Sequence, residues 1–154
     1  MIWANSWVLH MGEITITADI MQYISLFEKL TGVVVKDCLE ADDHIIFIVA
    51  EGQGSMAIGK KGEKVERFRQ MTRRKIRVIE FAPTPEQFLM NIFRTYEPVR
   101  VEISTKRKGV LHATVFVPPE NKARAIGKEG KNLRVARELV MRHFPVQSVS
   151  VSEA

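Results

Sequence analysis

The sequence predicts an α+β fold made of two tandem copies of one unit, each a small three-stranded sheet covered by helices on one face. Three observations predict it. The 154 residues include 45% hydrophobic side chains, enough for a packed interior rather than a disordered chain. A segment that begins at residue 57 recurs 68 residues later. Helical and strand-like patterns also follow one another in the same order, α-β-β-α-α-β, in both halves of the chain.

The internal repeat is clearest in two segments that contain glycine. Sliding the chain by 68 residues places Ala57–Gly62 (AIGKKG) on Ala125–Gly130 (AIGKEG). The register continues on both sides without a gap: Phe47 meets Val115, Val65 meets Leu133, Met71 meets Leu139 and Arg74 meets Arg142. The period is too long for a solenoid repeat and two copies are too few, so we expect two domains.

The elements of the first copy follow from its apolar spacing and its glycines. Apolar residues from Ile20 to Leu30 recur at helical spacing, with Thr17 as the expected N-cap and Gly32 as the stop. Two segments rich in β-branched and aromatic residues flank the polar turn 40–43 and predict a hairpin. In chain order we expect the first helix, strands over 33–38 and 44–50, a short helix before Gly59, a longer helix after Gly62 with Val65, Phe68 and Met71 facing inward, and a strand over 75–81.

The second copy begins with a strong helix-start signal. Thr84 is the expected cap, Pro85 suits the first turn because its missing N–H needs no partner there, and Gln87 completes a capping box. In chain order we expect this helix, strands over 99–105 and 110–117, a short helix, the second glycine segment, a helix with Leu133, Ala136, Leu139 and Val140 facing inward, and a strand over 146–151.

The predicted division of the chain is an N-terminal arm over 1–11, a first domain over 12–82 and a second domain over 83–154. The arm holds two tryptophans but lacks the basic start of a signal peptide, so we expect it to pack on the first domain. No apolar run approaches the roughly 18 residues of a membrane span. We therefore expect a cytoplasmic protein with no membrane partner. The single cysteine, Cys38, excludes a disulfide within the chain and is expected to be a small core residue.

The net charge of +5 conceals two strongly basic segments. Residues 1–55 hold two basic and eight acidic side chains, whereas residues 56–78 hold nine basic and two acidic ones. Residues 120–142 hold seven basic side chains against three glutamates. Such segments fit a polyanionic partner, although a solvated helix face is the alternative for each single cation.

The two glycine segments have the composition of a phosphate-binding turn. Glycine at both ends permits a tight turn and close approach of a ligand to the backbone. The N–H groups that open the following helix lack partners within it and carry the positive end of its dipole, which suits phosphate oxygens. Lysines in the turns add charge, and an isoleucine before each turn offers an apolar floor for bases. The candidate residues are Ile58, Gly59, Lys60, Lys61, Gly62, Lys64, Arg67 and Arg73 in the first copy, and Ile126, Gly127, Lys128, Glu129, Gly130, Lys131 and Arg134 in the second.

An Ile-Gly-x-x-Gly turn between two helices, within an α-β-β-α-α-β unit, resembles the type II KH domain. Two such units in tandem over about residues 12–152 resemble the KH pair of the NusA transcription factors, in particular the short archaeal NusA-like proteins. KH turns clamp about four nucleotides of single-stranded RNA. The resemblance implies nascent single-stranded RNA as the ligand, RNA polymerase as a partner, and regulation of transcription by termination or antitermination. We expect a monomer.

Alternative functions were weighed against the same residues. KH units also occur in ribosome-associated and ribosome-assembly proteins, so ribosomal RNA is the alternative ligand. Residues 54–61 come within one position of a nucleotide-binding P-loop, but Lys61 stands where Ser or Thr would hold magnesium. His44 and His112 are equivalent strand positions without metal-ligand spacing. We therefore expect no metal, no cofactor and no enzymatic activity. Glu129 predicts weaker phosphate binding by the second turn, unless its side chain points outward.

Overall fold

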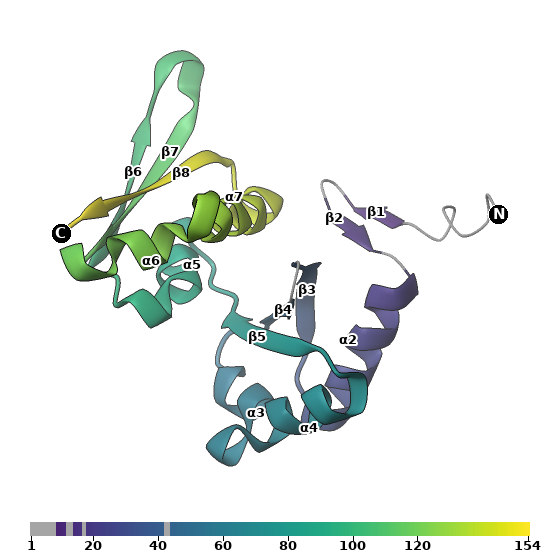
Figure 1. Ribbon diagram of the computed structural model, residues 1–154. Helices are drawn as coiled ribbons and strands as arrows, with labels where there is room; N and C mark the ends of the chain where they lie inside the picture. The colour runs from purple at the N-terminus through teal and green to yellow at the C-terminus, as the bar shows by residue number, and fades with distance from the viewer. Residues whose placement is uncertain (1–8, 12–13, 17, 42–43) are drawn as a thin grey trace. The chain divides into compact units, whose positions relative to one another are not determined.

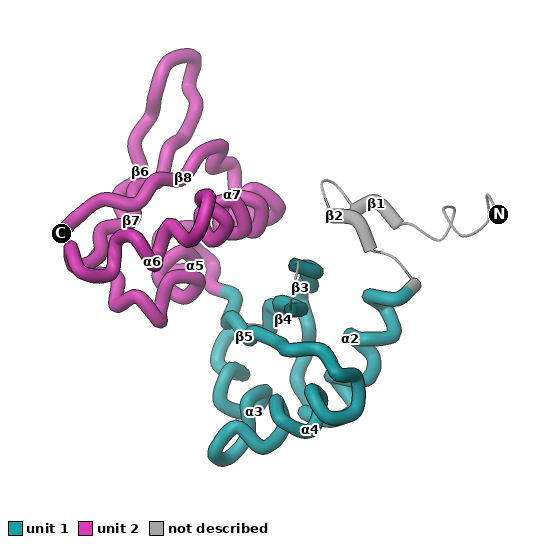
Figure 2. The backbone as a smooth tube through the Cα atoms, in the orientation of Figure 1, with its two compact units in different colours: residues 1–81 teal, residues 82–154 magenta. Residues whose placement is uncertain are grey.

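The computed structural model describes residues 9–11, 14–16, 18–41 and 44–154. The chain divides into two compact units, Met1–Phe81 (unit 1) and Ala82–Ala154 (unit 2), which are coloured separately in Figure 2. Each unit contains one three-stranded sheet together with helices, which confirms the predicted α+β class. Thr17, Asp42, Asp43 and residues 1–8 of the predicted arm lie outside the described residues.

Unit 1 has a mixed sheet with β4 at its centre (Figure 1). β4 pairs antiparallel with β3 and parallel with β5, so that Ile45 lies opposite Ile76. A separate hairpin pairs β1 with β2. The elements are β1 (Leu9–Met11), β2 (Ile14–Ile16), α2 (Ala18–Thr31), β3 (Val35–Glu40), β4 (His44–Val49), α3 (Gly54–Ile58), α4 (Glu63–Thr72) and β5 (Lys75–Glu80).

Unit 2 repeats this topology with β7 as the central strand (Figure 1). β7 pairs antiparallel with β6 and parallel with β8. The elements are α5 (Pro85–Ile92), β6 (Arg100–Thr105), β7 (Leu111–Val117), α6 (Lys122–Ile126), α7 (Lys131–His143) and β8 (Val146–Glu153). The order α-β-β-α-α-β predicted for each copy is therefore present in both units.

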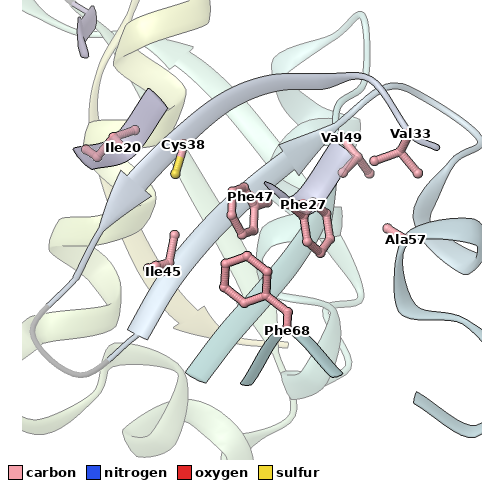
Figure 3. Close-up of a cluster of buried hydrophobic side chains, with 9 residues drawn as sticks. All are labelled: Ile20, Phe27, Val33, Cys38, Ile45, Phe47, Val49, Ala57 and Phe68. Carbon is pink, nitrogen blue, oxygen red and sulfur yellow. The ribbon is translucent and has the colours of Figure 1, made fainter. Parts of the chain in front are cut away.

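Three phenylalanines organise the core of unit 1 (Figure 3). The rings of Phe27 in α2 and Phe47 in β4 are stacked, with centroids 4.3 Å apart. Phe68 in α4 meets both rings edge-on, at 5.7 and 5.5 Å. These contacts hold both helices against the same face of the sheet. Cys38 belongs to this core cluster and is 2% exposed, as predicted for a small core residue.

The central strands of the two units differ on the face turned away from their cores. In β4, Ile46 and Ile48 are fully buried, like the core-facing residues between them, so both faces of this strand are apolar and buried. In β7, fully buried Ala113 and Val115 alternate with half-buried polar His112. The outer face of the β6-β7-β8 sheet is therefore polar, as expected for a sheet with one face packed on a core.

The last turn of the long helix departs from the predicted repeat. Met71 was expected to face inward but is 58% exposed, whereas its repeat partner Leu139 is fully buried. α4 ends after 10 residues, at a left-handed Arg73, while α7 continues for 13 residues. Arg142 thus lies inside α7, whereas Arg74 follows the end of α4. The gapless register consequently ends with α4, and Met71 lies in the final turn of the shorter helix.

The helix start at α5 confirms half of the predicted capping box. The Thr84 hydroxyl accepts a hydrogen bond from the backbone N–H of Gln87 at 3.3 Å, as predicted for an N-cap. The Gln87 side-chain amide instead donates to Asn91, at 3.0 Å. It binds one turn forward along the helix rather than back to the cap, so the reciprocal hydrogen bond of the box is not made.

Candidate nucleic-acid interface

The two glycine turns, Gly59–Gly62 and Gly127–Gly130, have nearly the same backbone conformation. The first glycine has φ 81° in both turns, the third residue has φ 55° and 57°, and the last glycine has φ 73° and 72°. The N–H of the last glycine donates to the carbonyl of the first, at 3.2 Å in unit 1 and 3.0 Å in unit 2. Three of the four residues in each turn therefore have a positive φ, which glycine adopts without steric cost. The tight turn predicted between the two helices is present in both units.

The first glycine of each turn is also required because there is no space for a Cβ atom at its position. A Cβ at Gly59 would lie 2.8 Å from Lys64 Cγ and 3.1 Å from the backbone nitrogen of that residue. A Cβ at Gly127 would lie 2.9 Å from the backbone nitrogen of Asn132. By contrast, nothing lies within 4 Å of a Cβ built at Gly62. The first glycine thus lets the turn close onto the helix that follows, whereas the last glycine is needed for its backbone angles alone.

A side chain at one repeat position ties the helices around each turn together. In unit 1, the Lys64 ammonium donates to the carbonyl of Met56 at 3.1 Å and to that of Thr31 at 3.5 Å. In unit 2, the Asn132 amide donates to the carbonyl of Arg124 at 2.9 Å and to the Tyr96 hydroxyl at 3.0 Å. Met56 and Arg124 are themselves repeat partners. Lys64, a predicted phosphate contact, therefore already binds helix-end carbonyls and positions the turn.

Two cations of unit 1 lie in the turn, and the others are distributed along α4. Lys60 and Lys61 are exposed within the turn, and Arg67 is exposed one helical turn further on. None of these three forms an ion pair with another residue in the described part of the chain. Arg73 caps the far end of α4, about 15 Å from the turn by helical rise, so the structure does not bring it to the others. Glu66 pairs with Arg69, and the hydrogen bond that this arginine donates lowers the pKa of Glu66.

In unit 2 the charges surround the turn more closely. Lys128 and Glu129 are both exposed within it, and Lys131 is the first residue of α7. The Arg134 guanidinium donates a hydrogen bond to the backbone carbonyl of Glu129. Because α7 has no acidic residue in its first turn, the positive end of its dipole is reinforced by Lys131 and Arg134. The structure thus places both predicted auxiliary cations of unit 2 beside the turn.

The isoleucines that precede the turns differ in exposure. Ile58 is 41% exposed and neighbours Met56, which is 47% exposed. Ile126 is half-buried and thus less exposed than Ile58, and the charged Arg124 stands at the position of Met56. Large exposed apolar side chains beside a polar turn are typical of a binding surface. Unit 1 therefore offers the larger apolar floor of the two.

Sequence reasoning missed the hydrogen-bonding residues that hold the short helices. Asn132 and Tyr96 were not singled out because the search followed charge. The signal was present, since the 68-residue register aligns Asn132 with Lys64. A third missed residue is Glu80, whose carboxylate accepts a hydrogen bond from the N–H of Gly54 at 2.8 Å and so holds the start of α3. The equivalent strand residue Glu153 instead pairs with Lys122 at 3.8 Å.

The described residues contain neither a candidate metal site nor a candidate membrane-spanning helix. Among residues 9–11, 14–16, 18–41 and 44–154, no three His, Cys, Asp or Glu side chains come together as metal ligands would. Over the same ranges, no helix combines the length and the apolar character that crossing a membrane requires.

Two α-β-β-α-α-β units, each with a glycine turn between its second and third helices, define a tandem KH-domain protein. Family comparison agrees with this class. A KH domain model matches residues 21–106, and a model of the NusA-like second KH domain matches residues 85–154.

The comparison with relatives is more specific. A probable transcription termination protein NusA of Thermoplasma acidophilum is 32% identical, with 94% of this chain and all of the relative covered. A protein of the same description from Methanococcus vannielii is 39% identical, with 88% of this chain and 77% of the relative covered. The crystal structure of APE1850 superposes with a TM-score of 0.73 at 31% identity, covering 89% of this chain and all of that one. The chain belongs to the NusA-like family of KH-domain proteins.

Proposed function

We propose that this protein is a transcription termination factor of the NusA type that binds nascent single-stranded RNA through its two glycine turns. The observation that carries the proposal is the recurrence of one exposed turn, with the same backbone angles, at the start of a long helix in both units. The names of the relatives support the role in termination. We further propose that residues 12–82 and 83–154 each act as one RNA-binding domain, that the chain is a monomer, and that RNA polymerase is its partner.

The proposed contact is a phosphate held by backbone and lysine together. The turn closes onto the following helix because Gly59 and Gly127 lack a Cβ, and the N–H groups that open this helix are the proposed donors to a phosphate oxygen. Lys60, Lys61 and Lys128 are exposed and able to pair with phosphates. Because KH turns hold about four nucleotides, single strands are favoured, since their bases are free to turn toward the protein. Ile58 and Ile126 lie where a base would stack.

The auxiliary residues divide into two roles in this proposal. Arg67 and Lys131 are close to the turns in sequence and are assigned phosphate contacts. Lys64 and Arg134 are assigned positioning roles, because the first binds helix-end carbonyls and the second binds a carbonyl of the turn itself. Arg73 has no role in the turn, since it lies at the opposite end of α4.

Charge reversal at the first turn tests the RNA contact. The double variant K60D/K61D should bind an unstructured RNA of about 20 nucleotides at least tenfold more weakly, with an unchanged circular dichroism spectrum. Aspartate tolerates the left-handed conformation at position 61, so the fold is preserved. The matched control K29D/K36D makes the same charge change at two exposed lysines outside both turns and should bind more tightly than K60D/K61D. Equal affinities of the two variants would contradict phosphate capture at this turn.

The transcription role requires a measurement in cells. Crosslinking of the protein to RNA, followed by sequencing, should recover nascent transcripts, because the proposed ligand is RNA leaving the polymerase. The K60D/K61D variant provides the control, since its signal should fall on the same transcripts. Recovery confined to ribosomal RNA would favour the ribosomal alternative and overturn the assignment to termination.

A further inference from the structure

The turn that joins β6 to β7 carries three consecutive cations, Lys106, Arg107 and Lys108, all exposed. None of them forms an ion pair with another residue of the described ranges. The turn is well defined, because the N–H of Lys106 donates to the carbonyl of Val110 at 2.6 Å and the N–H of Val110 donates back to Arg107 at 3.3 Å. In Figure 1 the β6–β7 hairpin extends beyond the helices of its own unit. Three unpaired charges are thus held together at the end of a hairpin.

The fold itself does not require this charge. In unit 1 the corresponding turn between β3 and β4 has the sequence Glu40-Ala41-Asp42-Asp43, with three acidic residues. Glu40 pairs with Arg74 at 2.6 Å. Two hairpins of the same topology therefore carry opposite charge, and the basic one attracts a polyanion that the acidic one repels.

The sheet face below the basic turn is lined by polar groups. His112 lies in the middle of it, with its Nδ1 2.6 Å from the Ser148 hydroxyl and its Nε2 2.9 Å from the Ser150 hydroxyl. Alternate residues of β6 point to one face, and Lys106 continues the series that includes Ser104, the strand partner of His112. Burial lowers the pKa of His112, and the positive charge of Lys106 lowers it further, so the ring is neutral at pH 7. Hydroxyl groups and one imidazole thus form a hydrogen-bonding surface beside the cations. The same face carries one carboxylate, Glu102, which pairs with Arg100 at 2.7 Å.

A cation–π contact lies at the other end of the same face. The guanidinium of Arg100 lies over the Phe116 ring, 3.9 Å from its centroid. The two residues are strand partners, and Phe116 shares the face of His112 because four residues separate them. A guanidinium over an aromatic ring offers a surface on which an unpaired base can stack. The face runs for about 20 Å along six residues of β6, enough for a few nucleotides.

We propose that the outer face of the β6-β7-β8 sheet is a second RNA-binding surface, in which Lys106, Arg107 and Lys108 hold phosphates and the Arg100–Phe116 pair receives a base. The inference rests on the proposed function, because the ligand is a longer stretch of the same RNA strand. It adds a site outside both glycine turns, on the opposite side of the sheet from the helices of unit 2.

A hairpin variant and two RNA lengths test the proposal. K106Q/R107Q/K108N removes the three charges, with asparagine at 108 because that residue has φ 60°. The variant should bind an unstructured RNA of about 20 nucleotides roughly tenfold more weakly, and its log–log salt slope should fall by about 2, for three phosphates on a single strand. An RNA of about four nucleotides, which one glycine turn accommodates, should bind within about twofold of the unmodified protein. The matched control K29Q/K36Q/R94Q removes three exposed cations elsewhere and should keep its affinity for the long RNA.

The possible outcomes separate the two proposals. Equal affinity of the hairpin variant and the control variant for the long RNA would overturn the second surface while leaving the glycine turns untouched. An equal loss for the long and the short RNA would also overturn it, because the hairpin would then not be a separate site. Failure of K60D/K61D to weaken either RNA would instead contradict the proposed function. Phe116→Leu gives a second readout, since it should weaken only the long RNA, by about threefold.

Discussion

Units 1 and 2 place their charges differently around the same turn. Unit 1 has two lysines within the turn, but Glu63 and Glu66 occupy the first turn of the following helix. Unit 2 has Glu129 within the turn, but Lys131 and Arg134 follow it. Over the seven positions that begin at the first lysine, unit 1 has three cations and two anions, whereas unit 2 has three cations and one anion.

The two sites therefore share their backbone conformation and differ in their pattern of charges. The turn angles agree within a few degrees although Lys61 is replaced by Glu129. The sequence alone suggests a weaker second turn because of that glutamate. The structure shows cations gathered around the same turn, with Arg134 bound to its carbonyl, so the total charge near a phosphate is no lower in unit 2.

Among the changes that distinguish the two units, replacing the first glycine of a turn by alanine has the largest expected effect on the free energy of unfolding. Gly127→Ala should destabilise the protein by about 3 kcal/mol, because its backbone (φ 81°, ψ 165°) is essentially confined to glycine and the added Cβ meets a backbone nitrogen at 2.9 Å. Gly59→Ala should cost about 2 kcal/mol, since the backbone nitrogen of Lys64 lies further from the added Cβ, at 3.1 Å. Urea unfolding followed by circular dichroism measures both losses.

Gly130→Ala is the matched control for this series. Gly130 has a left-handed backbone (φ 72°, ψ 18°), whereas Gly127 (φ 81°, ψ 165°) lies in a region essentially confined to glycine. The nearest atom to a Cβ at Gly130 is the end of the Arg134 side chain, at 3.6 Å. We therefore expect the backbone cost alone, about 1–2 kcal/mol. Equal losses for the two alanine variants of unit 2 would show that neither the ψ of Gly127 nor its close packing against α7 makes the first glycine the more demanding position.

Sequence reasoning predicted the architecture because glycine and apolar periodicity act locally. Thr84 caps its helix and Gly32 ends another, as their residue types predict. The reasoning failed where tertiary packing decides. Met71 has the right spacing for the core but lies in the last turn of a helix that ends early, and that end depends on a left-handed Arg73 that no sequence signal marks.

The candidate site was predictable in its backbone and less so in its side chains. Two glycines at fixed spacing identified both turns, since few other residues adopt those angles. Charge alone could not distinguish Lys64, whose ammonium binds two carbonyls, from Lys60, which is exposed. The candidate residues were chosen around the glycine turns, so the three consecutive cations between β6 and β7 were not predicted as a site. Only the pairing of the strands shows that this turn and His112 belong to one face.

Exchanging the charge at the third position of the turn has the smallest expected effect. It tests directly whether the difference between Lys61 and Glu129 makes the two turns differ in RNA affinity. In a chain whose first turn carries K60D/K61D, Glu129→Lys should raise the affinity for a short single-stranded RNA about fivefold, or ~1 kcal/mol, by replacing repulsion with attraction. Glu129→Gln removes only the repulsion and should give about half of that free energy. Because φ at this position is 57° with glutamate and 55° with lysine, the exchange leaves the backbone unchanged.

Fluorescence anisotropy at two salt concentrations measures the change in affinity, which should be smaller at the higher salt concentration. Unchanged affinity in both variants would show that the side chain at 129 points away from the RNA, and that the cations at 131 and 134 supply the charge of the second site.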